Sequence, residues 1–161
     1  MFILSLFLII LLTPVLAPPP TIWQPHTNGI FDIQWSASDD LLATASGDRS
    51  VKITSVQTGT TLYSLKGHAG TVKCISWDSR NPQLLSTGGR DGFIHLWDLR
   101  LANRENVIPS VTIASAHEDV EELGKTKVRR AKNLPPSRTV TGILQNALEP
   151  HQLISSGSAD G

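Results

Sequence analysis

Residues 84–99 read LLSTGGRDGFIHLWDL, and residues 41–56 read LLATASGDRSVKITSV. Aligned on their Leu-Leu pairs, which begin at residues 41 and 84, the two stretches agree at hydroxyl, acidic and aliphatic positions with a spacing of 43 residues. The matching pairs are Thr44 with Thr87, Asp48 with Asp91, Val51 with Ile94, and Ile53 with Leu96. A period of about 40–45 residues that contains several short strands is typical of the blades of a β-propeller. This repeat therefore decides the fold class.

The repeat extends in both directions from this pair. Residues 153–161, LISSGSADG, match its opening a third time, with Ser156 in the threonine position and Asp160 in the aspartate position. A second strip precedes each copy: IFDIQW at 30–35, TVKCISW at 71–77 and TVTGIL at 139–144. Alternation with a period of two, bounded by Gly, Asn and Asp turn residues, predicts short antiparallel strands. We expect an all-β chain whose first unit has strands at 30–35, 41–46, 50–54 and 60–65.

The composition is that of an ordinary globular protein. The chain has 161 residues, of which 40% are apolar, and this is enough to build a core. Its 14 basic and 14 acidic residues cancel, so the chain as a whole does not attract nucleic acid. Its single cysteine, Cys74, cannot form an internal disulfide, which favours a reducing compartment, and its apolar surroundings predict a buried side chain.

The N-terminus points to a different compartment. Residues 1–17 read MFILSLFLIILLTPVLA without a charge and are followed by three prolines, so we treat residues 1–20 as an apolar leader. The leader has the length of a signal-peptide core, but no Lys or Arg precedes it. A functional signal or anchor would send the protein to the secretory pathway or a membrane. The alternative is a misassigned start, and we expect membrane association only if the leader is functional.

The remaining residues offer no enzymatic chemistry. A recurring set of His, Thr or Ser, and Asp has the composition of a hydrolase triad, but no Gly-x-Ser-x-Gly turn accompanies it, and the set is present in every repeat. No Cys and His cluster has zinc spacing, and no phosphate-binding loop or pair of catalytic carboxylates stands out. We expect no catalytic residue, no metal site, no cofactor and no small-molecule substrate.

The second unit resembles a WD repeat, because Gly67-His68, Asp91 and Trp97-Asp98 match the hallmark positions of that family. The resemblance implies a β-propeller blade in which a histidine, a hydroxyl, an aspartate and a tryptophan form a buried hydrogen-bonded quartet. The second unit has all four residues: His68, Thr87, Asp91 and Trp97. The first unit has His26, Thr44 and Asp48, with Thr54-Ser55 where Trp-Asp is expected. The third unit has His117, Ser156 and Asp160.

The third unit also carries an insertion. His68 precedes Asp91 by 23 positions, whereas His117 precedes Asp160 by 43. The additional residues, 118–138, are first acidic and then basic, and they lack apolar periodicity, which predicts a solvated loop. Its basic part could instead contact DNA, a protein partner or the nuclear-import machinery. The residues concerned are Lys125, Lys127, Arg129, Arg130 and Lys132.

The order of these motifs resembles the denticleless family, over residues 22–161. The most specific parts are the stretch Gly88–Gly92 and the basic insertion, and the sequence Trp97-Asp98-Leu99-Arg100 resembles the adaptor-docking motif of such receptors. The resemblance implies a substrate receptor of cullin-four ubiquitin ligases that acts in the nucleus on proteins bound to the sliding clamp PCNA. It also implies that Trp97, Asp98 and Arg100 bind the ligase adaptor, a damaged-DNA-binding subunit. The alternative is a WD-repeat scaffold of another complex.

The number of repeats predicts an incomplete ring. A ring of about seven blades needs on the order of 300 residues at this period. Residues 22–161 hold two complete units and most of a third, so we expect a propeller fragment whose ring does not close. Its two lateral faces would then be apolar and exposed.

Overall fold

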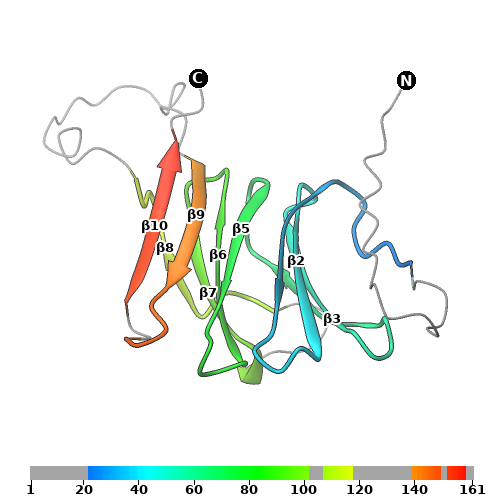
Figure 1. Cartoon of the computed structure of the whole chain (residues 1–161). Helices are drawn as coiled ribbons and strands as arrows, with labels where there is room; N and C mark the ends of the chain where they lie inside the picture. Colours follow the sequence, from blue (N-terminus) through cyan, green and yellow to red (C-terminus); the bar gives the residue numbers. More distant parts are fainter. Residues whose placement is uncertain (1–21, 102–106, 118–138, 150–151, 159–161) are drawn as a thin grey trace, which may run out of the picture.

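A computed structural model describes residues 22–101, 107–117, 139–149 and 152–158 as three antiparallel β-sheets standing side by side (Figure 1). The leader, the basic cluster of the insertion and Asp160 lie outside these residues. None of the helices among the described residues is both long and apolar enough to cross a bilayer.

The first sheet is the first repeat. It contains β1 (Ile30–Trp35), β2 (Leu41–Ser46), β3 (Ser50–Ser55) and β4 (Thr61–Lys66), hydrogen-bonded in that order. These bounds agree with the four strands that the alternation of the sequence predicts. Short hairpins join the strands, and the side chain of Asp48 orders the turn before β3 by accepting a hydrogen bond from the backbone N–H of Ser50.

The second and third sheets are the next two repeats. The second contains β5 (Val72–Trp77), β6 (Leu84–Gly89), β7 (Ile94–Asp98) and β8 (Val111–Ile113), with a single 3₁₀ turn, η1 (Leu99–Leu101), after β7. In the third, β9 (Thr139–Gln145) pairs with β10 (Leu153–Ser158). The chain is therefore an all-β partial propeller with two four-stranded blades, two described strands of a third, and an open ring, as the sequence predicts.

Adjacent blades pack through their apolar faces. One core cluster joins blades 1 and 2 and includes Val51, Ile53 and Ile75, all at most 1% exposed. A smaller cluster joins blades 2 and 3 and includes Cys74 and Val140. Burial raises the pKa of the Cys74 thiol to about 12, so this cysteine is a protonated, packed side chain.

Polar side chains also join the inner strands of neighbouring blades. The backbone N–H of Ile75 donates to Asp32 Oδ2 at 2.7 Å, and that of Trp77 donates to Gln34 Oε1 at 3.0 Å. Asp32 and Gln34 lie on β1, whereas their partners lie on β5. These side chains satisfy backbone donors on the edge of blade 2 that carries no further strand.

The outer edge of blade 1 is covered by a segment of blade 2. Val107, which lies between β7 and β8 in the sequence, forms a parallel bridge with Leu65 of β4. The backbone N–H of Val107 donates to the Ser64 carbonyl at 3.0 Å, and the N–H of Lys66 donates to the Val107 carbonyl at 3.1 Å. Val107 is 3% exposed, so this contact is part of the core.

Candidate protein-interaction site

The four residues of the predicted quartet in the second repeat meet inside blade 2. His68 Nδ1 lies 3.0 Å from Asp91 Oδ2, and His68 Nε2 lies 2.8 Å from Thr87 Oγ1. The indole N–H of Trp97 donates to the same threonine oxygen at 2.9 Å. Thr87 and Trp97 are at most 1% exposed. The hydroxyl of Thr87 on β6 therefore joins Trp97 on β7 to His68, and His68 in turn bonds to Asp91.

The charges in this network follow from the hydrogen bonds. Burial opposes ionisation of Asp91, but the hydrogen bond from His68, with those from backbone N–H groups, outweighs it and lowers the pKa of the carboxyl. Asp91 also accepts from the backbone N–H groups of Ala69 at 2.7 Å and Phe93 at 3.2 Å. Because an anionic Asp91 accepts from Nδ1–H, His68 Nε2 is assigned as the acceptor of the Thr87 hydroxyl proton.

Blade 1 repeats the network without its tryptophan. His26 Nδ1 lies 2.8 Å from Asp48 Oδ2, and His26 Nε2 lies 2.8 Å from Thr44 Oγ1. Burial lowers the pKa of His26, although Asp48 favours its charged form. Thr54 occupies the register position of Trp97, and its buried hydroxyl oxygen has no hydrogen-bond partner. The absence of an indole thus leaves the first network one member short.

The third set is not joined in the described residues. His117 packs against Gly157, and its buried Nε2 has no hydrogen-bond partner. The Ser156 hydroxyl instead lies 3.2 Å from Thr141 Oγ1. Asp160, the third member, is outside the described residues. A complete quartet in blade 3 stays a prediction.

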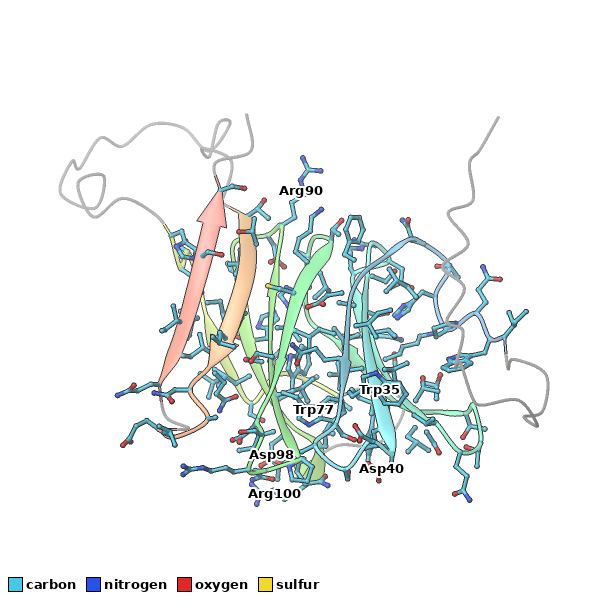
Figure 2. All side chains as sticks on the ribbon, in the orientation of Figure 1. Trp35, Asp40, Trp77, Arg90, Asp98 and Arg100 are labelled. Carbon is cyan, nitrogen blue, oxygen red and sulfur yellow. The ribbon has the colours of Figure 1, made fainter. Side chains whose placement is uncertain are left out.

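The sequence-predicted adaptor residues lie at one end of the strands. Figure 2 shows Asp98 and Arg100 at the end that also carries Asp40, whereas Arg90 lies at the opposite end. Arg100 Nε donates to Asp98 Oδ1 at 2.9 Å, and Nη2 donates to Asp98 Oδ2 at 2.6 Å. This pair lowers the pKa of Asp98, chiefly through the hydrogen bond from Arg100. The Arg100 side chain is 61% exposed and is paired with the Asp98 carboxylate.

The structure corrects one part of this assignment. Trp97 is only 1% exposed, because its ring packs in the core and its indole N–H is bonded to Thr87. It cannot touch a partner in this conformation. Trp97 instead fixes the end of β7, from which Asp98 and Arg100 project.

The networks do not have the geometry of a catalytic or metal centre. The Thr87 hydroxyl is buried and already bonded to His68 and Trp97, so it is not presented to a substrate. His68, Asp91 and His95 place one ligand atom each within 4.8 Å of one another. However, both ring nitrogens of His68 are engaged by Asp91 and Thr87, so a metal would have to break the quartet. Burial, followed by the nearby His68, lowers the pKa of His95 to about 4.

The basic cluster of the insertion lies in residues 118–138, outside the described part, so its contact with DNA, a protein partner or the import machinery stays a prediction.

Sequence reasoning also missed a polar pocket beside blade 1. One signal was available: Arg49 aligns with Gly92 of the second repeat, at a turn position that favours glycine.

Comparisons with known proteins agree with this architecture. The family model described as "WD domain, G-beta repeat" matches residues 18–55 and 59–98. The denticleless protein homologs of Danio rerio and Gallus gallus are 35% and 33% identical over 141 and 148 residues, which are 86% of this chain in both cases. The chain spans 22% and 20% of the length of those relatives.

The fold is similar to that of a solved propeller. The β-propeller domain of Myceliophteria thermophila Cps50 (Swd1) matches with a TM-score of 0.60 over 84% of this chain and 34% of that one. At 18% identity this match shows the fold alone.

Proposed function

We propose that this chain, which matches the WD-repeat family model over residues 18–55 and 59–98, is the propeller part of a substrate receptor for a cullin-four ubiquitin ligase. Its sequence similarity to denticleless proteins supports that choice within the family. In this role the chain is a binding scaffold and not an enzyme. It would recruit proteins bound to PCNA on DNA and act in the nucleus.

The observation that carries the proposal is the position of Arg100. The residue follows the Trp-Asp pair of a complete repeat, and the buried quartet of that repeat fixes the strand from which it projects. Asp98 holds the guanidinium in a defined orientation at the rim, where most of the side chain stays exposed. Because Nε and one N–H of Nη2 are donated to Asp98, the remaining Nη donors are the ones available to carboxylates or backbone carbonyls on a partner.

Nuclear action and PCNA-bound substrates rest on the family resemblance. The buried, unpaired cysteine is consistent with a reducing compartment. The competing destinations, the secretory pathway or a membrane, depend on residues 1–17, which lie outside the described part.

The test is capture of the ligase adaptor by the 161-residue chain when the two are co-expressed. We expect Arg100→Ala to reduce adaptor recovery at least tenfold, because it removes the exposed fork without touching the core. Arg100→Lys keeps the charge but loses the fork, so it should restore little binding. Lys73→Ala is the control, because Lys73 lies over the Phe31 ring on the inner strands, away from this rim. Circular dichroism checks that all variants retain their strands.

Unchanged adaptor recovery with Arg100→Ala would reject the receptor role and favour a WD-repeat scaffold of another complex. Equal losses with Arg100→Ala and Lys73→Ala would also reject it, because the loss would then not be specific to this rim.

A further inference from the structure

A polar pocket of about 430 Å³ opens beside the outer strands of blade 1, at the boundary with blade 2. The pocket is distinct from the Arg100 rim. Arg100 lies at the end of the molecule that carries Asp40, where β2 starts, whereas the pocket lies at the other end of β2, where β3 begins (Figure 2). Its lining consists of charged, hydroxyl and backbone groups: Thr27, Asp48, Arg49, Ser50, Lys52, Ser64, Lys66, Gly67 and His68.

The pocket carries an excess of positive charge. Arg49, Lys52 and Lys66 line the pocket together with one carboxylate, that of Asp48, and the Lys52 ammonium also donates to the Pro25 carbonyl. Asp48 is an anion, because hydrogen bonds from Ser50 and His26 outweigh its burial and lower its pKa. Its oxygens are already engaged, one by the Ser50 hydroxyl at 2.6 Å and the other by His26 at 2.8 Å. The three cations and one anion leave a net charge of about +2 for a ligand.

The backbone at Arg49 is strained. Its φ of 69° lies in the left-handed region, which costs a residue with a side chain on the order of 1 kcal/mol. The second repeat has Gly92 at the aligned position, with a φ of 76°, and glycine adopts this conformation without that cost. The first repeat thus keeps a cationic side chain in a turn where its sister repeat has glycine. Strain of this kind is concentrated at functional sites.

The other two cations are also particular to blade 1. Lys52 aligns with His95 of blade 2, which burial keeps largely uncharged because it lowers the pKa to about 4. Lys66 aligns with Ala114, because Leu65 pairs with Val51 as Ile113 pairs with Ile94. The repeat itself therefore does not require these charges, and a blade folds without them.

From this pocket we infer a binding site for a phosphate monoester, in the form of a phosphorylated serine or threonine on a partner protein. The dianion of a monoester matches the charge of the pocket, and Arg49 offers the guanidinium fork that recognises phosphate oxygens. The volume exceeds that of the phosphate group, so adjoining peptide atoms also fit. This inference goes beyond the adaptor role and does not depend on Arg100.

The probes are inorganic phosphate and O-phosphoserine, added to the ¹⁵N-labelled 161-residue chain and followed by amide chemical shifts. We expect millimolar binding of both, with the largest shifts at Arg49, Ser50 and Lys66. Dimethyl phosphate, a diester monoanion, and glutamate, a carboxylate, should bind at least fivefold more weakly. Equal binding of dimethyl phosphate or glutamate would overturn the assignment to a monoester.

The variants are Arg49→Asn and Lys66→Gln. Asparagine tolerates the left-handed turn, so Arg49→Asn removes the charge without adding backbone strain. We expect each variant to weaken O-phosphoserine binding about fivefold, and the pair to weaken it more than tenfold. Arg80→Asn is matched in charge and lies in the turn between β5 and β6, outside the pocket lining. An equal loss with Arg80→Asn, or no loss with the double variant, would overturn the site.

Discussion

At the scale of single residues, the buried hydrogen-bond networks of the two complete blades differ in one member, the tryptophan, and this difference affects stability. In blade 2 the Thr87 hydroxyl serves two buried partners, His68 and Trp97. In blade 1 the corresponding Thr44 hydroxyl serves His26, and Thr54 stands where the indole would be. A buried polar group that loses its partner costs about 1–3 kcal/mol. The same substitution should therefore cost more in blade 2 than in blade 1.

We predict that Thr87→Val lowers the free energy of unfolding by about 2–4 kcal/mol, because it leaves a tryptophan and a histidine nitrogen without partners. Thr44→Val should cost less, about 1–2 kcal/mol, because it leaves a single buried nitrogen, His26 Nε2, without its hydroxyl partner. Urea denaturation of the two variants measures the difference. Equal costs would show that the Trp97 bond does not contribute to stability.

At the scale of elements, the close approach of β6 and β9 decides how blades 2 and 3 fit together. A Cβ atom on Gly88 would lie 2.4 Å from Val140 Cγ1 and 2.9 Å from both Cys74 Sγ and Ile143 Cδ1. The lack of space at Gly88 by itself excludes a larger side chain. Gly29, by contrast, has nothing within 4 Å of the added atom.

We expect Gly88→Ala to destabilise the chain by about 1–3 kcal/mol, because the added methyl group forces the two sheets apart. This corresponds to a fall of roughly 2–4 °C in the unfolding midpoint for each kcal/mol. Gly29→Ala makes the same chemical change in open space and should leave the midpoint nearly unchanged. Thermal unfolding followed by circular dichroism compares the two, and a fall no larger than that of Gly29→Ala would contradict this account.

The strands themselves could be predicted from the sequence, but their lateral contacts could not. Alternation with a period of two locates β1 to within a residue, because it reflects only the local exposure of the strand. The bridge between Val107 and Leu65 joins residues that share no periodicity, so only the three-dimensional arrangement reveals it. The quartet of blade 2 was predictable from the resemblance to WD repeats, whereas the burial of Trp97 away from the adaptor surface depends on packing.

The phosphate-binding pocket was hidden from sequence reasoning for a related reason. Its cations come from β3, β4 and the preceding turn, at spacings that form no known motif. The alignment of Arg49 with Gly92 gave the one local signal, and it has meaning only once the left-handed backbone is known.

At the scale of the whole molecule, the described blades form an open arc with an apolar edge. β1 exposes Phe31, Ile33 and Trp35, which are 51%, 37% and 41% accessible, although Lys73 of blade 2 lies over the Phe31 ring. Ile75, at the position of Ile33 in the next repeat, is 1% exposed because blade 1 covers it. The same residue type at the same repeat position is thus core in one blade and surface in another. An exposed apolar strand of this kind promotes association between chains.

We predict that Ile33→Lys reduces self-association of the chain in light scattering while changing the free energy of unfolding by no more than about 0.5 kcal/mol. Ile75→Lys places a charge in the core between blades and should cost more than about 4 kcal/mol. Undiminished scattering with Ile33→Lys would show that this edge does not drive association.

The contact between Val107 and blade 1 bears on how such repeats can be exchanged in evolution. A unit that completed its own sheet could be duplicated or transplanted by recombination at any boundary. Here Val107 of the second repeat pairs with β4 of the first blade, so a breakpoint between the first two repeats would separate this residue from β4. We therefore expect the two repeats to be inherited together and not separated by recombination.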